Sequence, residues 1–207
     1  RQMCIRDRLK PILYQIGAIP IYRRTDHGVD SSKNRDTFER CYGLLAKGET
    51  LIIFPEGQSH DDPQLTELKT GAARLALGTI AETGIEPAVI PVGLTFPQKG
   101  QFRSSVLVQF GKPVELSLPD SHTDEQKVIE LTERIRQGMV SLTLNAESWE
   151  EIHLVSRVEH FFAFRHGKYH KRNLQQRFIA QQRIIDAQRL LRNYEPDQVR
   201  ALITQLK

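Results

Sequence analysis

A carboxylate that directly follows a short apolar segment is the first feature of this sequence that could do chemistry. Residues 51–54 (LIIF) are apolar, and Pro55, Glu56 and Gly57 follow them. An apolar run of this length that ends at a proline is typical of a buried strand. Because ligands of α/β proteins bind outside the carboxyl ends of strands, we expect Glu56 to face a ligand pocket. The alternative is an ordinary strand-end turn with a solvated glutamate.

Cationic residues at two other places could bind a phosphate. Residues 17–22 (GAIPIY) have the composition of another short strand, and Arg23 and Arg24 follow it. Residues 67–83 are rich in Ala and Leu and predict a helix, so Lys69 and nearby backbone N–H groups could meet an anion at its N-terminus. The guanidinium fork suits phosphate oxygens. Together with the carboxylate, these cations predict a site for a phosphorylated small molecule.

The elements that must position these residues alternate between strands and helices. Residues 34–47 place apolar side chains at helical spacing, with Asn34 as the expected N-cap and Gly48 as the expected C-cap. Residues 88–96 and 105–110 predict two more strands. Strands that alternate with helices predict an α/β fold whose mixed, partly parallel sheet is flanked by helices.

The second half of the chain is expected to be helical. Thr123 and Gln126 have the spacing of a capping box, and apolar residues recur behind them on one helical face. Residues 150–192 carry no strand signal, and a last helix is expected beyond Pro196. We therefore expect an α/β domain over residues 1–120 and a helical region over residues 121–207.

Composition excludes several classes of protein. The chain has 207 residues, of which 26% are charged, and a formal net charge of +4. These values fit a globular protein better than a disordered one. Only two cysteines are present, which excludes a disulfide framework and a four-cysteine zinc site. No apolar run approaches the ~20 residues that cross a bilayer.

The positive charge is concentrated late in the chain. Residues 157–192 hold nine Lys or Arg and two acidic residues, interleaved with aromatic residues. Such a stretch can lie on an anionic membrane surface or bind nucleic acid phosphates. It can also be a solvated helix face whose aromatic residues pack on the domain.

Residues 60–62 (HDD) are of types that could bind a metal ion or act as a substitute catalytic base. Further His, Cys or acidic partners in register are missing, so we expect no metal there. His60 also lies four residues beyond Glu56, which is the residue expected to face the pocket.

Four segments in order give the chain a family resemblance across about residues 9–115: GAIPIYR, FPEGQSH, KTGAARLAL and VIPVGL. They resemble the blocks of the glycerolipid acyltransferases, which include the glycerol-3-phosphate and lysophosphatidic acid acyltransferases. The F-P-E-G-x-S-H form is similar to a subgroup typified by fungal glycerol-3-phosphate/dihydroxyacetone phosphate acyltransferases. The matching positions are Gly17, Ile21 and Arg23 in one block, Phe54 to Gly57 in the next, and Ile90, Pro91 and Val92 in the last.

The resemblance implies a reaction and a set of site residues. The reaction transfers a fatty acyl group from acyl-CoA or acyl-carrier protein to a hydroxyl of glycerol-3-phosphate or lysophosphatidate, with no metal or other cofactor. Arg23 would bind the acceptor phosphate, and Glu56 with Gly57 would shape the acceptor pocket. Many members have an Arg two residues after the Glu-Gly pair, where this chain has Ser59-His60. The candidate substrate-binding residues are Arg23, Arg24, Phe54, Pro55, Glu56, Gly57, Ser59 and Lys69.

The catalytic block of the family, His-x-x-x-x-Asp, is expected upstream of Arg1. None of the seven histidines is followed five positions later by Asp. The resemblance therefore implies an N-terminally truncated, inactive chain whose parent associates with the cytoplasmic face of a membrane and binds no nucleic acid. Two alternatives stay open: a non-catalytic lipid- or phosphate-binding relative, and a nucleic-acid-binding module that uses residues 157–192.

Overall fold

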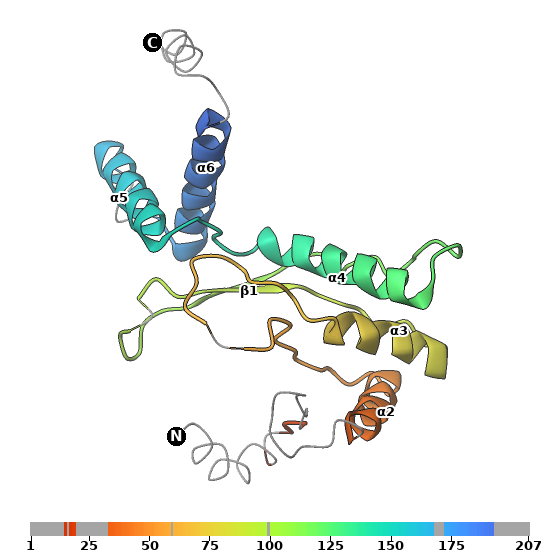
Figure 1. Cartoon of the computed structure of the whole chain (residues 1–207). Helices are drawn as coiled ribbons and strands as arrows, with labels where there is room; N and C mark the ends of the chain where they lie inside the picture. Colours follow the sequence, from red (N-terminus) through yellow and green to blue (C-terminus); the bar gives the residue numbers. More distant parts are fainter. Residues whose placement is uncertain are drawn as a thin grey trace. The chain divides into compact units, whose positions relative to one another are not determined.

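The described part of the chain is a mixed α/β structure rich in helix (Figure 1). The computed structural model describes residues 15, 17–19, 33–58, 60–98, 100–167 and 172–192. The elements run in the order α2 (Lys33–Ala46), α3 (Gly71–Thr83), β1 (Val92–Thr95), β2 (Leu107–Phe110), α4 (Asp124–Val140), α5 (Trp149–Arg165) and α6 (Leu174–Arg192).

The chain divides into two compact units. The first comprises residues 1–53 and 74–87, and the second comprises residues 54–73 and 88–207. The second unit therefore holds both the segment that begins with FPEG and the whole C-terminal half. The expected boundary near residue 120 stays a prediction.

In the first unit, α2 ends as the sequence predicts. Gly48 has a φ of +80°, a left-handed conformation that glycine adopts without steric cost. Its N–H donates to the Leu45 carbonyl at 3.0 Å, and the Glu49 N–H donates to the Leu44 carbonyl at 3.1 Å. These two bonds form a Schellman motif, which confirms Gly48 as the C-terminal cap. The expected N-cap at Asn34 is wrong, because the helix already includes Lys33 and an N-cap has a non-helical backbone.

A glycine sets the contact between α2 and α3. A Cβ atom added at Gly78 would lie 2.3 Å from the Tyr42 hydroxyl oxygen and 2.5 Å from the ring carbon that bears it. The Tyr42 ring therefore crosses α3 at Gly78, where no side chain lies in its way. Burial raises the pKa of the Tyr42 hydroxyl, with a further contribution from the Glu82 carboxylate.

In the second unit, β1 and β2 form an antiparallel pair in which Val92 lies opposite Phe110. Both strands confirm the expectation, within shorter bounds. One face of the pair is covered by α4 and the turn after it (Figure 1). A Cβ atom at Gly93 would lie 2.1 Å from the Leu142 carbonyl oxygen, and one at Gly138 would lie 2.6 Å from the Pro91 ring. The parallel pairing that the sequence predicts does not occur among the residues described.

The capping box at the start of α4 is confirmed. The Thr123 hydroxyl accepts from the Gln126 N–H at 3.3 Å, and the Gln126 side-chain oxygen accepts from the Thr123 N–H at 2.8 Å. The expected apolar face follows, with Val128, Leu131 and Ile135 all buried.

A buried carboxylate joins α5 to α6. The Glu159 side chain is only 1% exposed, and the Arg172 Nη1 atom donates to it at 2.9 Å. The Arg177 Nε atom lies 3.4 Å from the other carboxylate oxygen. A buried charge persists only when it is paired. Around this cluster, Val155 and Ala163 of α5 and Phe178 and Ile185 of α6 are buried.

The expected strand at residues 51–54 is wrong. The segment has no regular secondary structure, and Ile52 and Phe54 are strongly exposed. A strand needs a neighbour to accept and donate its backbone hydrogen bonds, and no described segment pairs with this one. Of the strand expected at residues 17–22, residues 20–22 lie outside the described part, and 17–19 are not in a strand. The helix expected from residue 67 begins at Gly71 instead, and the helix expected beyond Pro196 lies outside the described residues.

No helix within the described ranges combines the length and the apolar character needed to cross a membrane.

Two helical glycines make a matched test of the contact between α2 and α3. Gly43 of α2 has open space around its missing Cβ, whereas Gly78 faces Tyr42. We expect Gly43→Ala to raise the free energy of unfolding by about 0.5–1 kcal/mol, because alanine favours helix. Gly78→Ala should lower it by roughly 1–3 kcal/mol, because the Tyr42 ring must move. Urea unfolding measures both, and equal stability of the two variants would contradict the crossing.

Candidate functional site

The FPEG block forms a tight turn at the start of a long irregular segment. The Gly57 N–H donates to the Phe54 carbonyl at 3.1 Å, which closes the turn. Gly57 has a φ of +71°, in the left-handed region that side chains rarely adopt. The block therefore needs glycine at this position because of its backbone.

The Glu56 carboxylate orders the segment that follows the turn. Its Oε2 atom accepts from the Thr66 N–H at 3.0 Å, from the Thr66 hydroxyl at 2.8 Å and from the His60 Nε2 atom at 2.5 Å. The side chains of Glu56 and His60 are 23% and 19% exposed, so these bonds are partly shielded from water. A single oxygen atom of Glu56 thus holds both His60, four residues later, and Thr66, ten residues later.

Both ring nitrogens of His60 have polar partners. The Asp62 N–H donates to Nδ1 at 3.1 Å, and Nε2 lies 2.5 Å from the Glu56 carboxylate. The Asp62 carboxylate also lies 3.2 Å from Nδ1. The ring is therefore held between Glu56 on one side and Asp62 on the other.

The hydrogen bonds keep Glu56 ionised. Burial on its own raises the pKa of this carboxyl, but the two bonds from Thr66 and the bond and charge of His60 outweigh it. The pKa therefore lies below its ordinary value of 4.5. A carboxylate with a low pKa is a weak base, so Glu56 is suited to supply a fixed negative charge and a fixed shape rather than to take a proton.

Lys69 lies against the turn, as a cation of the site should. Its N–H donates to the Pro55 carbonyl at 2.8 Å. A Cβ atom at Gly57 would lie 3.3 Å from the Lys69 Cγ atom, so the lysine stem passes close to the glycine. Lys69 is exposed and precedes α3 by two residues. The structure thus brings together Pro55, Glu56, Gly57 and Lys69 of the predicted set.

The far side of the segment is held by residues that the sequence analysis missed. The Asn145 side-chain oxygen accepts from the Leu65 N–H at 2.9 Å, and the Ala146 N–H donates to the Pro63 carbonyl at 3.1 Å. The Trp149 ring N–H donates to the Asp61 carbonyl at 2.7 Å. Asn145 is 80 positions from Leu65, and no local pattern in the sequence signals a contact of that range.

The remaining predicted residues are Arg23, Arg24, Ser59 and Phe54, and of these the described contacts place only the Phe54 backbone in the turn. Arg23, Arg24 and Ser59 lie outside the described residues, and Phe54 is exposed at the edge of the turn. In the described ranges, no cluster of three or more His, Cys, Asp or Glu could hold a metal ion.

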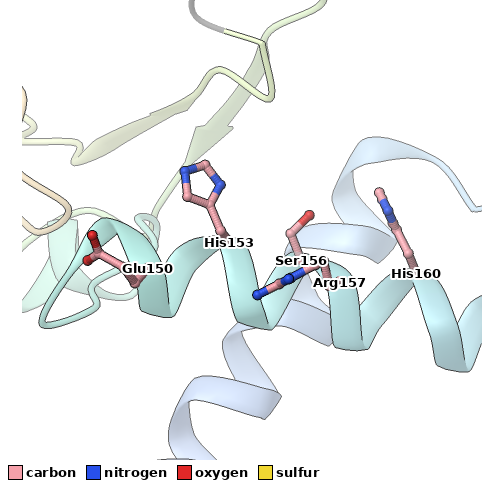
Figure 2. A pocket seen from close by; sticks show the side chains of 5 residues that line it. All are labelled: Glu150, His153, Ser156, Arg157 and His160. Carbon is pink, nitrogen blue, oxygen red and sulfur yellow. The ribbon is translucent and has the colours of Figure 1, made fainter.

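A hollow lies on α5 and was not predicted. It is a shallow depression of about 540 Å³. Figure 2 shows its five lining side chains along one side of the helix. The lining residues are Glu150, His153, Ser156, Arg157 and His160.

Comparisons with known proteins point to one family. Residues 3–95 match the family model described as Acyltransferase. Glycerol-3-phosphate O-acyltransferase 1 of Saccharomyces cerevisiae is 30% identical over 132 residues, which cover 60% of this chain and 17% of the relative. Glycerol-3-phosphate O-acyltransferase 2 of the same yeast is 29% identical over 134 residues, covering 62% of this chain and 18% of the relative.

A plant relative matches a shorter region. The chloroplastic 1-acyl-sn-glycerol-3-phosphate acyltransferase LPAT1 of Arabidopsis thaliana is 35% identical over 79 residues, covering 38% of this chain and 19% of the relative. The chain therefore spans under a fifth of the length of these curated relatives. No solved structure gives a significant match.

The Thr66 hydroxyl offers a clean test of the Glu56 network. Thr66→Val keeps the shape and removes the hydroxyl bond, so it should lower the free energy of unfolding by about 1 kcal/mol at neutral pH. It should also move the pKa of Glu56 up toward 4.5. Carboxyl NMR titration and urea unfolding measure the two effects, and Thr66→Ser, which keeps the hydroxyl, is the control.

The stability that Thr66→Val loses should depend on pH in a definite direction. Because folding lowers the pKa of Glu56, its stabilisation is fully present above the ordinary value of 4.5 and is lost as the pH falls through the folded value. The deficit of Thr66→Val should therefore shrink in acid. A deficit that stayed constant would show that the hydroxyl does not act through the Glu56 charge.

Proposed function

Residues 3–95 of this chain belong to the glycerolipid acyltransferase family, and on that premise we propose that the protein transfers a fatty acyl group to a glycerol-phosphate acceptor. The donor is acyl-CoA or acyl-carrier protein, and the acceptor is a hydroxyl of glycerol-3-phosphate or lysophosphatidate. The observation that carries the proposal is the fixed FPEG turn, where Glu56 is held by Thr66 and His60 and Lys69 lies against Gly57.

The proposed chemistry is a direct acyl transfer. The acceptor hydroxyl loses its proton to a base, its oxygen attacks the thioester carbonyl, and the ester forms as the thiol leaves with a proton. A histidine suits the role of base because its unperturbed pKa, about 6.5, lies near the working pH. The His-x-x-x-x-Asp block expected upstream of Arg1 would provide it. No metal or cofactor besides the acyl donor takes part.

The residues of this chain would bind and orient the acceptor. Arg23, Arg24 and Lys69 are proposed to hold the phosphate, because guanidinium and ammonium groups donate strongly to its oxygens. Glu56 and Gly57 would form the wall of the acceptor pocket. Support comes from the network that holds the turn rigid, since a preorganised wall keeps the reacting hydroxyl in place.

The proposed reaction also implies a setting. Its products are lipids or lipid precursors, so we place the reaction at the cytoplasmic face of a membrane, with no nucleic acid partner. The partly parallel sheet expected of the domain belongs to the same proposal.

The test uses a longer protein that includes the upstream residues. With acyl-CoA and labelled glycerol-3-phosphate or lysophosphatidate, Arg23→Ala and Lys69→Met should each raise the KM of the acceptor about tenfold or more, because each removes a charge-assisted contact to phosphate. Glu56→Gln should lower kcat/KM. Lys47→Met is the matched control, since Lys47 is exposed just beyond the end of α2.

Two outcomes would contradict the assignment. If Arg23→Ala and Glu56→Gln both leave the kinetics unchanged, the site is wrong. If the longer protein binds the acceptor but forms no ester, it is a non-catalytic relative.

A further inference from the structure

The outward face of α5 is aromatic and basic. Leu154, Phe161 and Phe164 are 46%, 60% and 76% exposed, although they are large and apolar. Arg157 and Arg165 lie between them at helical spacing and are also exposed. Residues three, four and seven apart share one side of a helix, so these five form a continuous stripe. We call Leu154, Arg157, Phe161, Phe164 and Arg165 the α5 face.

The α5 face lies opposite the buried side of the helix. The opposite side of α5 supplies Val155, Glu159 and Ala163, all buried. A helix that packs on one side normally turns polar residues to water on the other. Here the second side exposes aromatic rings instead, and exposed apolar area of this kind costs about 25 cal/mol per Å² until it is covered.

We propose that the α5 face docks on the surface of an anionic lipid bilayer. Aromatic rings with interleaved arginines are suited to the boundary between head groups and acyl chains, where rings are buried and guanidinium groups meet phosphate. Each cation near an anionic surface contributes about 1 kcal/mol. This docking gives the proposed membrane setting a binding surface, and it can be measured without acyl transfer.

The charges around the face favour a negatively charged surface. Arg172 and Arg177 turn inward to Glu159, so they do not contribute to the α5 face. Glu150, four residues before Leu154, is exposed on the same side of α5, and Glu151 and Glu159 are buried, so the two arginines outnumber the exposed carboxylate on this side. Figure 2 shows Ser156 and Arg157 among the residues that line the shallow hollow, so a hydroxyl and a guanidinium lie there beside each other in the sequence.

Vesicle flotation of the 207-residue chain tests the proposal. The chain should float with phosphatidylcholine vesicles that contain phosphatidylserine and much less with phosphatidylcholine alone. Arg157→Gln should weaken binding about fivefold, the equivalent of one surface cation. Phe161→Ser and Phe164→Ser should each weaken it roughly tenfold, because each removes a buried ring from the interface.

Matched control variants distinguish binding by the α5 face from binding caused by overall charge or overall hydrophobicity. Arg183→Gln makes the same charge change at an exposed position of α6, and Phe102→Ser removes an aromatic ring that is 91% exposed between β1 and β2. Both should bind vesicles within twofold of the unchanged chain. Circular dichroism confirms that each variant keeps its helices.

Several results would overturn the proposal. Equal losses from Arg157→Gln and Arg183→Gln would mean that overall charge, not the α5 face, attracts the vesicle. Release by inorganic phosphate at constant ionic strength would mean that the face binds free phosphate. If Phe164→Ser instead dissociates a dimer in sedimentation and leaves flotation unchanged, the face is an interface between copies of the chain.

Discussion

The segment between residue 54 and α3 contains neither helix nor strand, so its backbone N–H groups have no ladder in which to pair. Side-chain acceptors take that role: the Glu56 carboxylate accepts from the Thr66 N–H, and the Asn145 amide oxygen accepts from the Leu65 N–H. Asn145 is itself fixed, because its NH₂ group donates to the Val140 and Thr143 carbonyls. The position of the FPEG turn therefore depends on how α4 ends, many residues later in the chain.

This dependence explains how a carboxylate can lie at the site that we propose for a phosphorylated molecule. A free carboxylate would repel the phosphate and would also be costly to shield from water. The three donors on Glu56 compensate part of its charge, and they hold the group ionised and immobile. Lys69 then brings an opposite charge to the same turn. Glu56 therefore fixes the shape of the turn, and in the proposed function the cations are the groups that attract the ligand.

Local sequence patterns correctly predicted those features of the fold that are stabilised by hydrogen bonds between residues close in sequence. The Gly48 cap and the Thr123–Gln126 box were correct because the bonding partners lie within a few residues. The strand at residues 51–54 was wrong because a strand exists only through a neighbour, and composition cannot supply one. Glu56, Gly57 and Lys69 could be selected from the sequence, but Thr66 and Asn145 could not. Their roles arise from contacts that the chain makes only after it folds.

Charge counted along a sequence is not the charge that a surface presents. Residues 157–192 carry nine Lys or Arg, yet two of these arginines face the buried Glu159, where they hold α5 against α6. A buried carboxylate left alone would unfold the hairpin, so these cations are committed to the interior. The arginines of the α5 face, Arg157 and Arg165, are instead exposed, and they share their side of the helix with exposed aromatic rings. The same stretch therefore does two separate things: one set of its arginines stabilises the fold, and another gives the outer face of α5 its chemical character.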